Sequence, residues 1–207
     1  MKVLVMCEES QRVCKEFRAL GHEAYSTDLQ DCSGGHPEWH LKMDCFLAFD
    51  LIKPELVIAH PPCTYLSNAG ATSLFQNKIL NQERYKKGLE AKNFFLKFFE
   101  LPINKIAIEN PVPMKIYNLP KSSQCIQPFQ FGEPYTKKTY LWLIGLPPLI
   151  PTDILVGDKI IPWVDSSGRK CKDGTIHKGI AHSAKDRSKT FIGIAKAMAQ
   201  QLGGLCE

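Results

Sequence analysis

The fold is decided by the stretch LVIAHPPC, residues 56–63. Its first four residues are apolar without interruption, which predicts a fully buried strand. The two prolines that follow end the strand, because proline lacks the amide proton that a sheet requires. We expect the cysteine after them at the rim of a site, although a cysteine in a turn often acts only as a small apolar side chain.

Outward from this stretch, apolar strands alternate with segments of helical spacing. We expect strands at residues 2–7, 23–28, 41–45, 56–60, 105–109 and 139–144, and helices at 9–20, 77–100 and 190–202. This order predicts an α/β fold, a doubly wound Rossmann-like sheet built from parallel βαβ units. Ligands of such sheets bind beyond the carboxyl ends of the strands, which here selects residues 7–9, Asp28, 60–63 and 109–111.

Composition sets the class of protein. The 207 residues, 44% of them hydrophobic and 23% charged, fit one domain with a small appendage. No apolar run is long enough to span a membrane, and Glu8 and Glu9 come too early for a secretory signal, so we expect a soluble cytoplasmic protein. The eight cysteines are then expected as free thiols in a reducing compartment.

One cysteine and histidine cluster has a spacing that would allow zinc: Cys32, His36, His40 and Cys45. The loop around it is rich in turn residues, where histidine and cysteine serve more often as polar filler. We therefore assign no metal.

Positive charge gathers in the second half of the chain. Residues 1–110 carry 13 Lys and Arg against 14 Asp and Glu, whereas 111–207 carry 13 against 7. Residues 159–189 alone hold 8 basic and 3 acidic side chains. Such a stretch suits a polyanion such as nucleic acid, although a solvated lysine-rich loop gives the same pattern. We divide the chain into a catalytic core at 1–147, a basic insertion at 148–186 and a closing helix at 187–207.

Two side chains carry the chemistry that the strand ends predict. Glu109 follows a buried strand, and a carboxylate there is costly unless it is paired, used or capping a turn. Cys63 follows the neighbouring apolar strand. Together they suggest a thiolate nucleophile beside an acid that handles protons.

At these residues the chain resembles the DNA cytosine-5 methyltransferases. Pro61-Pro62-Cys63 matches the family's nucleophile motif, and Glu109-Asn110 matches its Glu-Asn-Val motif, with Pro111 in place of valine. Residues 132–139 line up with its Gly-x-Pro-Gln-x-Arg-x-Arg segment, with Lys137 and Thr139 at the two arginine positions. The agreement covers roughly residues 1–145, with a weaker echo at 187–203. The run at 131–147 also looks like small methylase-like proteins common in phage genomes, which implies the cytoplasm of a bacterial or phage-infected cell.

The resemblance implies methyl transfer from S-adenosylmethionine to C5 of cytosine in DNA. Cys63 as a thiolate would add to C6 of the flipped-out base, and Glu109 would hydrogen-bond or protonate N3. Lys137 is the candidate for the positive charge that lowers the pKa of Cys63. The residues implied to hold the DNA are Pro62, Asn110, Thr139, Lys170 and Lys172.

For the cofactor, the resemblance implies Glu8 or Glu9 at its amino group, Asp28 at its ribose hydroxyls, Asp44 near the adenine, and Pro61. The family's first loop is rich in glycine, whereas residues 6–10 contain none, which restricts close approach of backbone to cofactor. As structural residues, Glu8 and Glu9 would lie at a helix N-terminus, which favours negative charge, and Asp28 would form a turn.

Two departures from the family keep other functions open. Only about residues 148–186 are available to read a DNA sequence, so we expect low sequence specificity. The same cysteine chemistry would serve an enzyme that modifies free pyrimidine nucleotides. The glycine-free loop and altered arginine motif fit a non-catalytic nucleic-acid-binding protein. A zinc deaminase is disfavoured, because Leu66 stands where its Pro-Cys-x-x-Cys motif needs the second cysteine.

Overall fold

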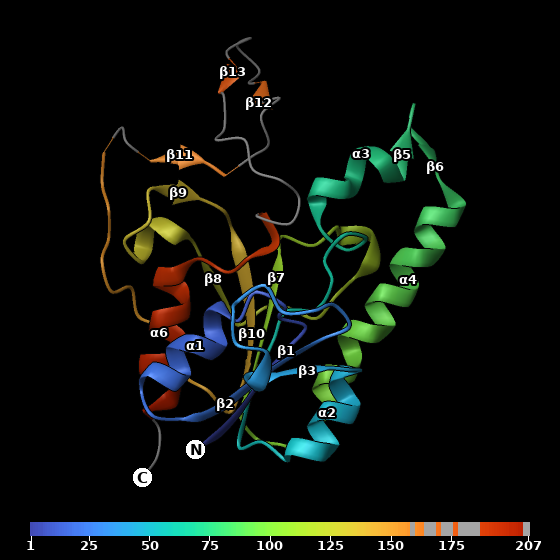
Figure 1. Cartoon of the computed structure of the whole chain (residues 1–207). Coiled ribbons are helices and arrows are strands. Elements are labelled where there is room, and N and C mark those ends of the chain that lie inside the picture. The colour runs from blue at the N-terminus through green and yellow to red at the C-terminus, as the bar shows by residue number, and fades with distance from the viewer. Residues whose placement is uncertain (158–159, 164–168, 171–175, 178–186, 205–207) are drawn as a thin grey trace.

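A computed structural model describes residues 1–157, 160–163, 169–170, 176–177 and 187–204. A seven-stranded sheet forms its centre, with helices on both faces (Figure 1). The strands of this sheet are β1 (Lys2–Met6), β2 (Glu23–Asp28), β3 (His40–Lys42), β4 (Leu56–Ala59), β7 (Ile106–Pro111), β8 (Gln124–Ile126) and β10 (Thr139–Ile144). The helices are α1 (Arg12–Ala19), α2 (Cys45–Ile52), α3 (Ala71–Leu74), α4 (Gln82–Lys97) and α6 (Ile192–Gly203).

The sheet is mostly parallel, with the order β3-β2-β1-β4-β7-β10-β8. The first five strands run parallel to one another, while β10 is antiparallel to both of its neighbours. The carboxyl ends of β1, β2, β4 and β7 therefore meet the amino end of β10 at one edge. This confirms a mixed α/β fold compatible with a Rossmann-like sheet.

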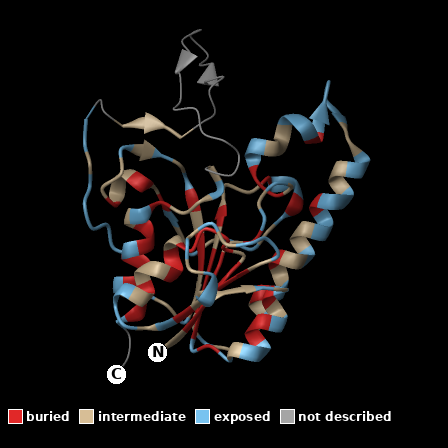
Figure 2. Cartoon of the chain, in the orientation of Figure 1, coloured by how far each residue is buried: buried red, intermediate tan, exposed pale blue. Residues whose placement is uncertain are grey.

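The two faces of the sheet carry separate apolar cores. In β1, Val3 and Val5 pack toward α1 and α6, and the alternating residues Leu4 and Met6 pack toward α2 and α4. All four are fully buried, and the buried residues concentrate along the central strands (Figure 2). Burial of a valine or leucine side chain contributes about 1.5–3 kcal/mol, so this alternation holds the strand ends in place.

Several predicted boundaries are wrong, and turn chemistry explains the largest error. The helix expected at 77–100 begins only at Gln82, because Asn77 and Lys78 adopt left-handed φ values of 49° and 66°. They link β5 (Phe75–Gln76) to β6 (Ile79–Leu80) in a hairpin. Asn81 then begins α4 by accepting a hydrogen bond from the Arg84 amide. Helix α2 and strand β8 were not predicted, and α1 begins later than predicted.

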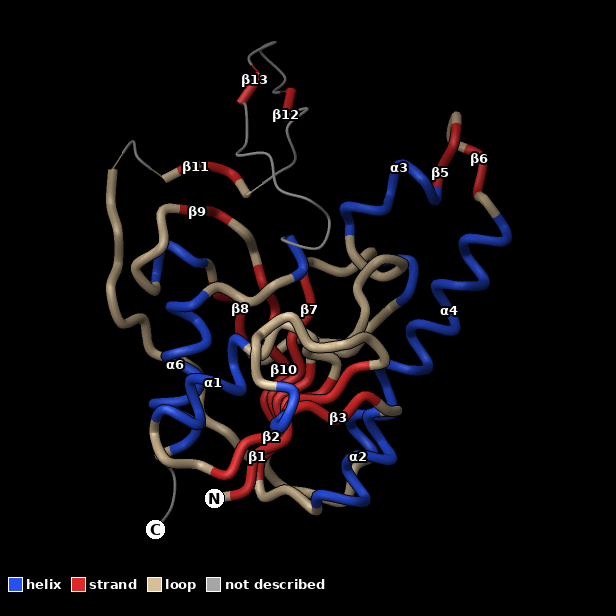
Figure 3. Tube along the Cα trace, in the orientation of Figure 1, coloured by secondary structure: helices blue, strands red, loops and turns tan. Residues whose placement is uncertain are grey.

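Shorter strands rise above the carboxyl edge of the sheet, as Figure 3 shows. They are β9 (Tyr135–Thr136), β11 (Ile161–Pro162), β12 (Arg169–Lys170) and β13 (Ile176–His177). The insertion predicted at 148–186 lies partly outside the described residues, and its early part joins β9 through β11. In the part of the chain that the structure describes, no helix has both the length and the apolar character needed to cross a bilayer.

Candidate active site

A cleft of about 750 Å³ opens at the carboxyl edge of the sheet. On one side it is lined by Glu8, Glu9 and Asp28, from the ends of β1 and β2. On the other it is lined by residues from the ends of β4 and β7 and from the segment before β10, namely Pro61, Pro62, Cys63, Glu109 and Lys137. Eight residues predicted from five separate parts of the sequence therefore share one cavity.

Backbone hydrogen bonds hold the Cys63 loop beside the Glu109 loop. Strands β4 and β7 are neighbours, and the loops that follow them remain joined. The Asn68 amide donates to the Val112 carbonyl at 2.8 Å, and the Met114 amide donates to the Leu66 carbonyl at 2.7 Å. The Cys63 carbonyl accepts from Leu66 and Ser67, which folds the loop into a tight turn. These bonds fix the backbone at Cys63 relative to the backbone that follows Glu109.

The electrostatics of Cys63 correct one expectation from the sequence. Burial of the thiol and the negative charge of Glu109 raise the pKa of Cys63, and the charge of Lys137 lowers it only in part. Lys137 thus acts in the predicted direction but does not prevail. In the free protein Cys63 is held as a thiol, and its ionisation requires a change in its surroundings.

Glu109 is shifted in the opposite direction. Burial of its carboxyl favours the neutral form, but a hydrogen bond from His60 and the charges of Lys137 and His60 outweigh burial, so the pKa of Glu109 is lowered. Nδ1 of His60 lies 3.4 Å from Oε2 of Glu109. The strand-end rule selected residues 60–63, which include His60, but no role was predicted for His60.

Cations gather around the mouth of the cleft. The Lys137 ammonium donates to the Arg187 carbonyl at 2.9 Å and lies 5.7 Å from the centre of the Phe191 ring. This contact brings the segment before α6 to the cleft, which Arg187 and Lys189 line. Arg84, from α4, lines the cleft as well and donates to the Thr64 carbonyl at 2.9 Å. The sequence analysis had singled out neither Arg84 nor Arg187 as a site residue.

On the other side of the cleft, the acids are tied into the backbone. The Glu8 carboxylate accepts from the amides of Val13 at 2.7 Å and Cys14 at 3.2 Å, so it caps α1. Burial raises the pKa of Glu8, partly offset by the charge of His60 and by these amide bonds. The structural role considered for Glu8 is therefore present, while its carboxyl also lines the cleft.

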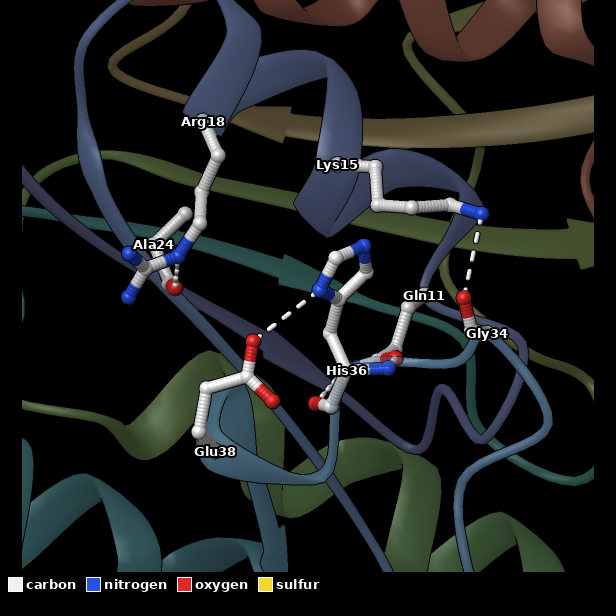
Figure 4. Close-up of polar contacts among 7 residues, drawn as sticks. All are labelled: Gln11, Lys15, Arg18, Ala24, Gly34, His36 and Glu38. Carbon is white, nitrogen blue, oxygen red and sulfur yellow. Dashed lines mark hydrogen bonds and ion pairs between the residues drawn. The ribbon is translucent and has the colours of Figure 1, made fainter.

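The first loop reaches glycine-like conformations without glycine. Cys7 and Gln11 adopt left-handed φ values of 60° and 55°, which L-residues seldom take. The Gln11 side chain holds this conformation by donating to the His36 carbonyl at 2.8 Å and accepting from the His36 amide at 3.1 Å (Figure 4). Ser33 adds a hydroxyl bond to Glu9, and its amide donates to the Glu9 carbonyl. The loop after β2 thus supports the loop after β1.

The possible zinc residues have other partners. His36 pairs with Glu38 at 3.0 Å (Figure 4), and both ring nitrogens of His40 bond to other groups at 2.9 Å, the Ser26 hydroxyl and the Gln30 carbonyl. Across the described residues, no three His, Cys, Asp or Glu side chains gather as a metal site would need.

Three other predicted residues, Asp44, Asn110 and Thr139, are not part of the cleft lining. Asp44 caps α2 through the amides of Phe46 and Leu47. Asn110 is fully buried and donates to the Pro111 carbonyl. Thr139 is also buried and bonds to the Lys137 carbonyl. Lys172 and the side chain of Lys170 lie outside the described residues.

Neither a scan against protein-family models nor a search of curated proteins found a match to this chain.

Proposed function

We propose that the protein transfers a methyl group from S-adenosylmethionine to C5 of cytosine in DNA through a covalent bond to Cys63. The observation that carries this proposal is the convergence of Cys63, Glu109 and Lys137 on one cleft. The place of the cleft supports it too, since it lies beyond the carboxyl ends of the parallel strands, where sheets of this kind bind their ligands.

The opposite pKa shifts of Cys63 and Glu109 suggest how substrate binding creates the nucleophile. The charge of Glu109 is one of the two causes that raise the pKa of Cys63. N3 of cytosine is a hydrogen-bond acceptor, so Glu109 can bond to it only when its carboxyl is protonated and donates. Binding of the base therefore neutralises the charge of Glu109. Lys137 then acts without opposition from Glu109 and favours the thiolate, which adds to C6. Thiolate formation is therefore coupled to recognition of the base.

The acidic side of the cleft fits the cofactor. Carboxylates accept hydrogen bonds and attract cations, and S-adenosylmethionine offers ribose hydroxyls and an ammonium group. Asp28 is assigned to the ribose hydroxyls, because it lies at the end of β2 and lines the cleft. Glu9 and Glu8 are assigned to the ammonium group, with Glu8 also capping α1. When bound, the cofactor supplies the electrophilic methyl group.

The cations at the mouth of the cleft suit a DNA backbone. Arg84, Lys137, Arg187 and Lys189 all line it, and such side chains contact phosphates without specifying bases. Cys63 lies within the cleft, so a cytosine inside a duplex is out of its reach and must be flipped out or single-stranded.

The test is methyl transfer from radiolabelled S-adenosylmethionine to mixed-sequence DNA. We expect label in DNA with the wild type and with the control Cys125→Ser, which removes an exposed thiol on β8. Cys63→Ser should reduce the rate by at least about 10³-fold, as loss of a covalent nucleophile does. A folded wild type that labels no DNA, or a Cys63→Ser variant with unchanged activity, would refute the proposal.

Binding of nucleic acid without catalysis is the second candidate. It is favoured by the raised pKa of Cys63, which disfavours the thiolate in the free protein. This function predicts DNA retention that weakens with salt, together with no binding of S-adenosylmethionine in equilibrium dialysis. Label on free deoxycytidine monophosphate but not on DNA would instead identify a nucleotide-modifying enzyme.

A further inference from the structure

His60 occupies the position between the two sides of the cleft. It follows β4, which lies between β1 and β7 in the sheet, and its amide donates to the Met6 carbonyl at 2.9 Å. Its side chain is only 9% exposed, yet it lines the cleft. A histidine in this place was not needed to end the strand, because the two prolines after it already do so.

The surroundings of His60 are acidic and incompletely hydrogen-bonded. Nδ1 lies 3.4 Å from Oε2 of Glu109, and the imidazole also interacts electrostatically with the carboxyl of Glu8. Nε2 is buried and has no hydrogen-bond partner among the described residues. The charged and titratable groups that face this centre are Glu8 from β1, Glu109 from β7, Lys137 from the segment before β10, and Cys63 from its own loop. The carboxyl groups of Glu8 and Glu109 therefore both interact with this imidazole.

We propose that His60 is a positioning residue for Glu109, and that it stores the proton which Glu109 delivers to N3 of cytosine. This inference rests on the proposed methyl transfer and adds a requirement to it. Glu109 alone is a poor proton donor near neutral pH, since it is held as a carboxylate. An imidazolium that touches that carboxylate supplies the missing proton.

The proton balance closes over these groups and water: the Cys63 thiol loses its proton to water as the base binds and regains one when the product leaves. As the Cys63 thiolate forms its bond to C6, Glu109 receives a proton on Oε2 from Nδ1 of His60, which becomes neutral, and gives a proton to N3. After C5 has been methylated, its proton leaves to water and the S–C6 bond breaks to regenerate the thiolate. The N3 proton returns through Glu109 to His60. Hydrogen bonds of this kind are often long in a free enzyme and shorten when substrate binds.

The decisive variant is His60→Asn, which keeps a hydrogen-bond donor near Nδ1 but cannot carry a proton charge. With His60, the proton can be supplied at any pH up to about the pKa of an imidazole. Without His60, it can be supplied only up to about the pKa of a carboxyl. These differ by about two pH units in model compounds, so the loss of kcat/KM should reach about 10²-fold above neutral pH. Toward acid pH, the loss should shrink as Glu109 becomes protonated by itself. Both proteins share the pH dependence that comes from Cys63, and it cancels when kcat/KM of the variant is divided by kcat/KM of the wild type. The ratio therefore isolates the effect of His60.

The experiment measures methyl transfer to DNA between acid and alkaline pH for the wild type, His60→Asn and the control His22→Gln. His22 lies before β2, at the opposite edge of the sheet. A His60→Asn deficit that grows with pH, with His22→Gln unchanged, supports the inference. A uniform deficit at every pH, or none, overturns it and leaves the proposed function intact.

A second measurement separates failure of this inference from failure of the proposed function. NMR titration of the His60 imidazole, in the wild type and in Glu109→Gln, does not depend on turnover. The inference requires the pKa of His60 to fall when the carboxylate is removed, and an unchanged titration overturns it. A wild type that shows this coupling but methylates no DNA refutes the proposed function, and the proton role of His60 is then refuted with it.

Discussion

Glu8 is buried and the side chain of Glu109 is 15% exposed. The two glutamates lie near the ends of β1 and β7, on either side of β4, and they are used in opposite ways. The Glu8 carboxylate is occupied by two amides of α1, and burial raises its pKa. Glu109 bonds to a side chain, His60, rather than to the backbone, and its pKa is lowered despite burial. A carboxylate that completes a helix is mainly structural. A carboxylate that is kept charged by side chains, here His60 and Lys137, is available to a substrate.

The same substitution at both positions gives the sharpest test of this comparison. Glu109→Gln should reduce methyl transfer by about 10²–10⁴-fold, the range for loss of a general acid or base, with little change in Tm. Glu8→Gln should reduce kcat far less, but lower Tm by about 2–4 °C, as expected for a cap worth about 1 kcal/mol in a chain of this size.

Activity with radiolabelled cofactor and Tm by circular dichroism are measured on the same two preparations. If Glu8→Gln lost activity as severely as Glu109→Gln while keeping its Tm, the division between a structural and a chemical glutamate would be wrong.

The side of the cleft that carries Cys63 and Glu109 follows from local sequence patterns. Two prolines come after His60 at the end of β4, and residues 106–108 at the start of β7 are all apolar. Because parallel strands place their carboxyl ends together, Cys63 and Glu109 were expected at one edge before any contact was known. Their shared place in the cleft fits that expectation.

The structural side could not be predicted in the same way. That Glu8 caps α1 depends on Gln11 adopting a left-handed conformation, which is fixed by a distant contact to His36. The surroundings of His60 are acidic because Glu8 and Glu109 approach it from two other strands. Long-range contacts of this kind leave no local periodicity, whereas the hairpin at Asn77 and Lys78 was missed because its turn residues also fit a helix.

Cys63 offers a test of smaller effect on the chemical side alone. Because Glu109 raises the pKa of Cys63 and Lys137 lowers it, Glu109→Gln should speed alkylation of Cys63 by iodoacetamide several-fold near neutral pH. Lys137→Met should slow it, and Lys137→Arg should restore the wild-type rate. Peptide mass spectrometry measures Cys63 separately, with the exposed Cys125 as the internal reference.

Opposite changes in the two neutralising variants are the essential result. If Glu109→Gln and Lys137→Met both accelerated alkylation, the variants would have opened the site instead of changing the charge that Cys63 experiences.

The smallest expected effect concerns stability as a function of pH. The contributions of the two glutamates to stability should change with pH in opposite directions. The folded-state pKa of Glu109 lies below its ordinary value of 4.5, so its contribution to stability is present above pH 4.5 and is lost as the pH falls through the folded pKa. The folded-state pKa of Glu8 lies above 4.5, so its contribution is present below that pH and is lost as the pH rises through the folded pKa. The Tm of the wild type relative to Glu109→Gln should therefore rise with pH, and relative to Glu8→Gln it should fall. Two difference curves of the same slope would show that the two carboxyls titrate alike, and the contrast between the two sides of the cleft would not hold.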